Sequence, residues 1–132
     1  MGRIKVSSTI PTSPQKLYKA YLSSTEHSNF TGGEAKINPK IGGKMSAWDG
    51  YITGKFIELA VNKKIVQTWR TSDFSEAIKD SILTITSEKV DSRTKISLIH
   101  TNIPDGQGES YKKVWKDFYF TPMKKYFGKS VR

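Results

Sequence analysis

Large apolar side chains recur at steps of three and four residues in the last quarter of the sequence, from Glu109 to Phe127. This spacing predicts one long helix with a broad apolar stripe, and the lysines of the segment fall largely outside that stripe. A helix with so many aromatic residues is not stable alone in water, so we expect the preceding sheet to hold it. The stripe consists of Tyr111, Trp115, Phe118, Pro122 and Tyr126, with Val114, Tyr119, Met123 and Phe127 beside them.

Apolar and polar residues alternate with a period of two through much of the middle of the chain, which is typical of half-buried strands. In one such stretch, Trp48, Ile52 and Phe56 share a face. Asn62-Lys63 and Asp91-Ser92 are expected to reverse the chain between successive strands. The predicted strands are 3–10, 47–58, 64–71, 81–89 and 94–102, with a loop at 72–80.

Two short helices are predicted after the first strand. Pro14 suits the first turn of a helix that is capped by Ser13. Ser24 is expected to cap a second helix that carries Phe30 and ends at Gly32-Gly33.

The order of these elements predicts an α+β fold. Residues 34–44 look irregular, with proline and glycine as punctuation. We expect the predicted strands and helices to form a single domain over 1–132, in which a curved antiparallel sheet of about six strands wraps around the long C-terminal helix.

The chain is strongly basic, with 22 Lys and Arg against 12 Asp and Glu and a formal net charge of +10. Such a balance favours anionic partners, whether an acidic protein, nucleic acid or an anionic membrane surface. The lysines are spread along the chain, so a solvated, lysine-rich surface explains the composition equally well. A nucleic-acid platform needs exposed aromatic residues between the lysines, whereas these aromatic residues follow the core pattern, and we therefore expect no nucleic acid.

Several classes of protein are excluded or disfavoured by what the sequence lacks. No cysteine occurs, so disulfides and thiolate metal sites are excluded. The sequence contains no run of about 18 apolar residues, which is the length needed to span a bilayer. Its first residues also lack the apolar core of a secretory signal. No heptad seam indicates an oligomer. We therefore expect a cytoplasmic monomer without membrane contact, cofactor or metal.

A catalytic site requires a nucleophile with its base, paired carboxylates or a metal cluster, and the sequence offers few such groups. Its two histidines, His27 and His100, are far apart in the chain. His100 shares the apolar parity of its strand, so we expect it in the interior as a structural residue. His27 lies in the polar stretch SSTEHSN and is expected in solvent. The residues therefore predict a protein that is not an enzyme.

Several segments resemble a known protein family. Residues 54–59 (GKFIEL) and 65–70 (IVQTWR) look like paired strands of the activator-of-heat-shock-ATPase family. Ile103-Pro104, residues 114–120 (VWKDFYF) and residues 124–128 are similar to the closing signature of that family. The resemblance is strongest to the C-terminal domain of eukaryotic co-chaperones that stimulate the ATPase of the 90-kDa heat-shock chaperone.

This resemblance covers about 30–128 and implies the helix-grip fold of the START-like (SRPBCC) superfamily. The co-chaperones also carry an N-terminal domain, joined by a linker, that supplies much of the binding and stimulation. We expect this chain to correspond to the C-terminal domain, with the N-terminal domain absent, either as a stand-alone relative or as an excised domain.

The resemblance further implies a non-enzymatic co-chaperone domain. It would bind the 90-kDa heat-shock chaperone and promote its ATPase cycle by favouring the closed state. Lysines of the last helix are candidate partner-binding residues, although a solvated helix face explains each of them at least as well. They are Lys112, Lys113, Lys116, Lys124 and Lys125.

An alternative is a carrier of small hydrophobic ligands, because helix-grip relatives often leave a cavity between sheet and helix. Large residues expected near such a cavity instead fill the core if the interior is well packed. A third alternative is an enzyme of the cyclase or hydratase type, which needs polar groups that converge inside the cavity. The candidate cavity residues are Trp48, Trp69, His100, Trp115 and Tyr119, of which His100 is the polar group on offer.

Overall fold

The computed structural model describes residues 2–74, 79–104 and 106–130, with side chains as far as Gly128. The predicted loop at 72–80 therefore lies partly outside the described residues. In chain order the elements are β1 (Gly2–Ile10), α1 (Pro14–Leu22), α2 (Ser24–Thr31), β2 (Lys36–Ile37), β3 (Lys44–Ala47), β4 (Ile52–Ala60), β5 (Lys64–Thr71), β6 (Ser81–Val90), β7 (Arg93–Ile103), α3 (Gly108–Val114), the π-helix η1 (Trp115–Phe120) and α4 (Thr121–Ser130).

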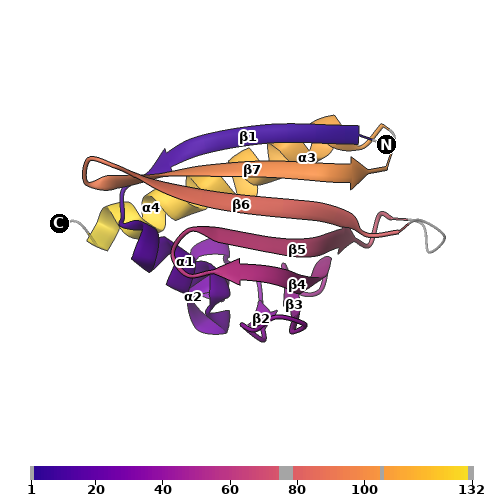
Figure 1. The fold of residues 1–132 in the computed structure, drawn as a ribbon, viewed down its shortest axis with the longest axis horizontal. Coiled ribbons are helices and arrows are strands. Elements are labelled where there is room, and N and C mark those ends of the chain that lie inside the picture. The colour runs from indigo at the N-terminus through magenta and orange to yellow at the C-terminus, as the bar shows by residue number, and fades with distance from the viewer. Residues whose placement is uncertain (1, 75–78, 105, 131–132) are drawn as a thin grey trace.

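The strands of the described chain form one antiparallel sheet of seven, in the order β1-β7-β6-β5-β4-β3-β2. The segments α3, η1 and α4 run in line behind β1 and β7, and α2 packs against α4 (Figure 1). This arrangement confirms the predicted α+β fold, with two short helices after the first strand and a long C-terminal helical segment. The sheet has more strands than expected because the region 34–58 contains three of them.

The prediction of a single strand over 47–58 is wrong. The chain reverses between β3 and β4, and Ala47 pairs with Ile52 across the turn. Trp48, Asp49 and Gly50 have φ angles of 53°, 59° and 92°, all in the left-handed region. Asp-Gly is a strong hairpin signal, but the apolar alternation continues through it and masks the turn. Trp48 is therefore a turn residue. The stretch 34–44, predicted to be irregular, also contains the short strand β2.

The last helix contains an irregularity that its apolar pattern does not predict. The π-helix η1 lies between α3 and α4, and a π-helix bonds each N–H one residue further back than an α-helix does. The extra residue per turn shifts the faces, so that residues four apart stay on one side. The predicted buried stripe includes Phe118, but this residue is 50% exposed. The buried residues are Tyr111, Trp115, Tyr119, Phe120, Met123 and Phe127.

The two short helices begin at serine caps. The Ser13 hydroxyl accepts a hydrogen bond from the Lys16 N–H at 3.2 Å, as predicted. The second cap is Ser23 rather than Ser24, because the Ser23 hydroxyl accepts from the Glu26 N–H at 3.2 Å. This helix ends where Gly32 adopts a φ of 87°, which glycine tolerates without strain. The caps fix the entry of α1 and α2 toward the sheet.

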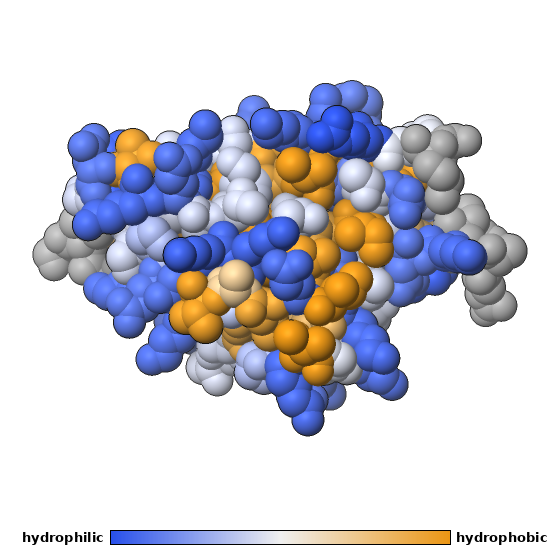
Figure 2. Space-filling model, in the orientation of Figure 1, coloured by the Kyte–Doolittle hydropathy of each residue, from blue (hydrophilic) through white to orange (hydrophobic). Residues whose placement is uncertain are grey.

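The core lies between the inner face of the sheet and the helices. Inner-face residues of neighbouring strands meet in register, as in the pairs of Ile4 with His100 and of Val6 with Leu98. The opposite face of the sheet is turned toward the viewer in Figure 1. On that side of the molecule, apolar residues gather over the middle and hydrophilic residues form the rim (Figure 2).

Candidate functional site

Four of the five candidate cavity residues come together in the core. The ring centre of Trp69 lies 4.6 Å from that of His100 and 5.9 Å from that of Trp115. The Trp115 ring lies 4.7 Å from the Tyr119 ring. All four side chains are fully buried. Trp48 is separate from this cluster and packs against the exposed Phe118, with ring centres 5.5 Å apart.

The hydrogen bonds of His100 define which of its ring nitrogens carries the proton. The Ser81 hydroxyl donates to the Trp69 carbonyl, so Ser81 Oγ is left to accept from His100 Nε2 at 2.7 Å. Nδ1 of His100 in turn faces the Trp115 indole N–H at 3.4 Å and accepts from it. A general base has to accept a proton from its nucleophile, whereas this imidazole donates one. The Ser81–His100 pair is therefore arranged as a structural contact.

His27 is the second buried histidine, and the prediction that it lies in solvent is wrong. A backbone carbonyl can only accept, so Nδ1–H of His27 donates to the Tyr21 carbonyl at 2.9 Å. Nε2 then accepts from the Tyr119 hydroxyl at 3.0 Å. His27, Phe30 and Thr31 are buried together. Their spacing of three and four residues is the helical signal that the polar composition of the stretch concealed.

Burial controls the protonation of these groups. It lowers the pKa of His27 to about 4, with the hydrogen bond to the Tyr21 carbonyl opposing the shift. Burial likewise lowers the pKa of His100 to about 4. It raises the pKa of Tyr119 well above its usual value, with the nearby Tyr21 adding to the shift. At neutral pH both histidines are therefore uncharged, and Tyr119 keeps the proton that it donates.

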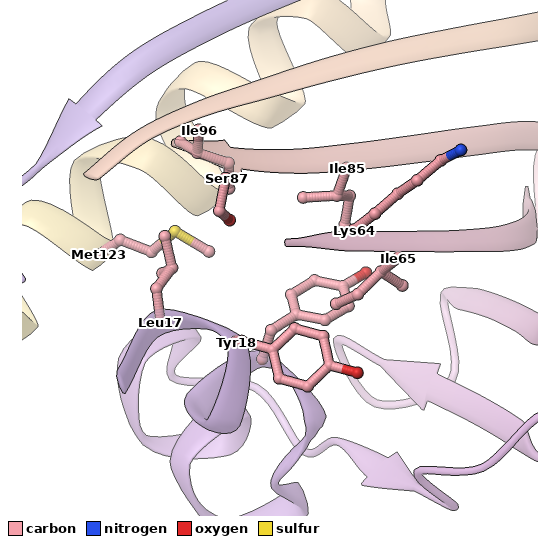
Figure 3. Close-up of a pocket in the computed structure, with 9 residues that line it drawn as sticks. Leu17, Tyr18, Lys64, Ile65, Ile85, Ser87, Ile96 and Met123 are labelled. Carbon is pink, nitrogen blue, oxygen red and sulfur yellow. The ribbon is translucent and has the colours of Figure 1, made fainter. Parts of the chain in front are cut away.

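The interior leaves little room for a ligand beside these residues. A pocket between α1 and the sheet has a volume of about 10 Å³, roughly enough for one water molecule (Figure 3). Leu17, Ile96 and Met123 point into it, and none of the five candidate cavity residues lines it. Among the described residues, the buried indole nitrogens of Trp48 and Trp69 have no hydrogen-bond partner. A ligand-binding role for the five residues stays a prediction.

The candidate partner-binding lysines lie on two sides of the last helical segment. Four of them line an open groove of about 780 Å³ between this segment and β1. Lys125 instead lines a second depression, beside Asn29 and Tyr126 of the α2–α4 contact. The sequence did not predict that β1 lies beside these lysines, because the local pattern of residues does not determine the order of strands in the sheet. The four groove lysines are Lys112, Lys113, Lys116 and Lys124.

Two further classes of site are missing from the described chain. Over residues 2–74, 79–104 and 106–130, no group of three or more His, Cys, Asp or Glu side chains is arranged to hold a metal ion. In the same residues, no helix is long and apolar enough to cross a membrane.

Comparison with known proteins places these features in a family. The family described as "Activator of Hsp90 ATPase homolog 1-like protein" matches residues 11–128. The human activator of 90 kDa heat shock protein ATPase homolog 1 is 28% identical over 130 residues, which are 98% of this chain and 38% of the relative. An uncharacterised protein of Schizosaccharomyces pombe is 31% identical over 120 residues, which are 91% of this chain and 35% of the relative. The chain thus spans little more than a third of these relatives.

A solved structure agrees with the sequence match. The crystal structure of an HSP90 activator from Plasmodium falciparum superposes with a TM-score of 0.88 and 27% identity, over 96% of each chain. The predicted helix-grip fold is confirmed by this neighbour. Because the family match covers most of the sequence, including the sheet and the last helical segment, the chain belongs to the activator of Hsp90 ATPase homolog 1-like family.

Proposed function

We propose that this domain binds the 90-kDa heat-shock chaperone and promotes its ATPase cycle without performing catalysis itself. The family match over residues 11–128 carries the proposal, because named relatives in the comparison are activators of that ATPase. This chain spans about a third of those relatives, so activation by the domain alone is part of the proposal. A cytoplasmic, monomeric protein is the form in which we expect it to act.

The physical basis of such activation is differential binding. A protein that binds the closed chaperone more tightly than the open one shifts the population toward the closed state. A tenfold preference corresponds to about 1.4 kcal/mol, which is within the usual range of allosteric coupling. No catalytic group of the domain needs to approach ATP. The structural, proton-donating arrangement of His100 is consistent with this non-enzymatic role.

The basic surface supports an acidic partner. The formal net charge of +10 favours encounter with a negatively charged protein, and binding through it weakens as salt rises. We propose that lysines of the last helical segment contribute to this contact. They are Lys112, Lys113, Lys116, Lys124 and Lys125, all of which are exposed.

The interior favours this proposal over a carrier of small hydrophobic ligands. A ligand pocket for a drug-sized molecule usually has a volume of about 300–1,000 Å³. The pocket between α1 and the sheet has about 10 Å³, and large aromatic side chains fill the space between sheet and helix.

The decisive experiment measures the steady-state ATPase rate of the purified chaperone with and without this chain. We expect stimulation at low salt that weakens at physiological salt. The double variant Lys113→Glu/Lys116→Glu should lose most of it, while Lys55→Glu/Lys63→Glu, with the same charge change on residues of another surface, should retain it. A folded chain that neither binds the chaperone nor changes its ATPase rate at low salt overturns the proposal.

A further inference from the structure

The free edge of β1 forms one wall of the groove that the four lysines line. β1 is the first strand of the sheet order and pairs with β7, and no described strand lies on its other side (Figure 1). Val6, Ser7 and Ser8, three residues in succession, line the groove. Successive side chains of a strand point to opposite faces of the sheet. Three consecutive residues can therefore line the same groove only if the groove lies along the edge of the strand. Unpaired backbone N–H and C=O groups on such an edge are a template for a further strand.

The last helical segment forms the opposite wall. Groove residues extend along it from Glu109 to Lys124, a length of at most roughly 22 Å, because an α-helical residue rises about 1.5 Å and the wider turns of η1 rise less per residue. An extended segment of about six or seven residues has the same length. Val6 is half-buried and Phe120 is buried, so the floor between the walls is apolar. The helical wall is therefore long enough for a short extended peptide, while on β1 the lining comprises the three residues Val6 to Ser8.

The charges along the groove favour an acidic occupant. Lys112 forms an ion pair with Glu109, with its amino group 3.4 Å from the carboxylate. Among the described residues, Lys113, Lys116 and Lys124 form no ion pair, and Asp117 is the other acid of the lining. The lining thus carries four lysines against two acids, a net charge of +2.

From this geometry we propose that the groove binds an extended acidic peptide segment, which pairs with the edge of β1 as a further strand while its carboxylates face Lys113, Lys116 and Lys124. A strand edge offers alternating donors and acceptors, which another polypeptide backbone matches. The phosphate backbone of a nucleic acid presents acceptors alone and leaves the edge carbonyls unmatched. A second copy of this chain would bring one positive groove against another. The groove selects its occupant by this chemistry, whichever protein supplies the segment.

The test uses a fluorescein-labelled decapeptide of alternating threonine and glutamate, with binding measured by fluorescence anisotropy at low salt. Two further forms carry N-methyl groups on all threonines or on all glutamates, because each set blocks the hydrogen bonds of one edge of the added strand. We expect one of these forms to bind at least tenfold more weakly and the other to bind like the parent. Equal binding of all three peptides would mean attraction of charges without strand pairing and would overturn the proposal. So would the lack of binding of the parent peptide at 1 mM.

Protein variants locate the binding. The double variant Lys113→Glu/Lys116→Glu should weaken binding of the parent peptide at least tenfold. Lys125→Glu should change it less than twofold, because Lys125 lies outside the groove. Backbone amide resonances of residues 2–10 should shift when the peptide is added to ¹⁵N-labelled protein. Shifts confined to another surface contradict the proposal.

Two other occupants are tested in the same conditions. Tighter binding of a ten-nucleotide oligothymidine than of the peptide would assign the groove to nucleic acid. Concentration-dependent self-association that the double variant abolishes would assign it to a second copy of the chain. A protein that stimulates the chaperone but binds no peptide refutes this inference and leaves the proposed function standing. Peptide binding without any effect on the chaperone does the reverse.

Discussion

Nε2 of His27 lies 3.0 Å from the hydroxyl of Tyr119, although the two residues are 92 positions apart in the sequence. This hydrogen bond joins α2 to the π-helix η1 inside the core, and His27 also holds the carbonyl of Tyr21 at the end of α1. Three helical elements therefore meet at one uncharged imidazole. Because a buried polar group without a partner is costly, the contact makes the position of each element depend on the other two.

Replacement of Tyr119 by phenylalanine should destabilise the fold. The change removes the donor to His27 Nε2 and leaves a buried acceptor unsatisfied, which costs about 1–3 kcal/mol. Urea denaturation measures this loss as a lower free energy of unfolding. Tyr126→Phe is the matched control, because its hydroxyl bonds Glu26 at 3.2 Å from a partly exposed site, and its cost should stay below about 0.5 kcal/mol. Equal losses in the two variants would contradict the structural role of the His27–Tyr119 bond.

Stability should fall as the pH is lowered from about 6.5 toward 4. The pKa of His27 and of His100 is about 4 in the folded protein, against 6.5 for an unperturbed histidine of the unfolded chain, so in this window the unfolded chain binds more protons. Protonation of the unfolded chain therefore opposes folding, and each histidine lowers the free energy of unfolding by roughly 3 kcal/mol between pH 6.5 and pH 4. Free energies of unfolding at several pH values give the slope.

The variant His27→Gln should have about half this pH dependence, because His100 still titrates. A slope in the variant equal to that of the wild-type protein would show that acid destabilisation arises elsewhere.

Alanine at Gly54 should severely destabilise the sheet. A Cβ atom at this position would lie 2.1 Å from the Thr68 carbonyl oxygen, which belongs to the backbone of the neighbouring strand β5. The strands must move apart to admit it, so we expect a loss of about 3 kcal/mol or more, or failure to fold. This contact explains why glycine stands at the start of the GKFIEL segment.

Gly128→Ala is the control for this change. Nothing lies within 4 Å of its added Cβ, and the residue is in α4. Alanine there should raise the free energy of unfolding by roughly 0.5–1 kcal/mol. Chemical denaturation compares the two variants, and a Gly54→Ala protein within about 1 kcal/mol of the wild type would refute the steric argument.

Two aromatic residues of the last helical segment should differ in their response to truncation. Trp115 is 1% exposed and contacts Trp69, His100 and Tyr119, so Trp115→Ala should cost about 3–5 kcal/mol. Phe118 is 50% exposed and packs against Trp48 alone among the described rings, so Phe118→Ala should cost about 1 kcal/mol or less. Thermal or urea unfolding distinguishes these values. The reverse order would mean that the helix continues through this segment without a π turn.

Particular residues show which parts of the fold local sequence patterns predict. The hairpin of β6 and β7 and the Ser13 cap follow from alternation and capping chemistry, which act over a few neighbouring residues. The turn at Trp48 escapes the pattern because its apolar side chain fits the alternation of a strand. Phe118 departs from the predicted stripe because the period of the helix changes within η1. Both errors arise where backbone geometry departs from the ideal period on which the pattern depends.

The candidate site residues were likewise predicted in part from local patterns. Strand parity correctly predicts His100 in the interior, whereas the polar neighbours of His27 in the sequence wrongly predict it in solvent. The hydrogen-bond partners of His27 are the carbonyl of Tyr21 and the hydroxyl of Tyr119, which only the folded chain brings to it. The candidate lysines follow from the sequence, but their division between the β1 groove and the α2 side does not.

The sequence alone determined the fold class, the order of the elements outside the region of β2 to β4, and most of the core of this protein, because periodicity and capping depend on neighbouring residues. The tertiary structure alone decided that β1 ends the described sheet beside a basic groove, that His27 is buried without charge, and that the side chains between α1 and the sheet leave a pocket of about 10 Å³. These properties depend on contacts between segments 100 or more positions apart, such as Glu26 with Tyr126 and Gly2 with Ile103. The physical reason is that burial and strand order are set by the packing of the whole chain, which no local pattern encodes.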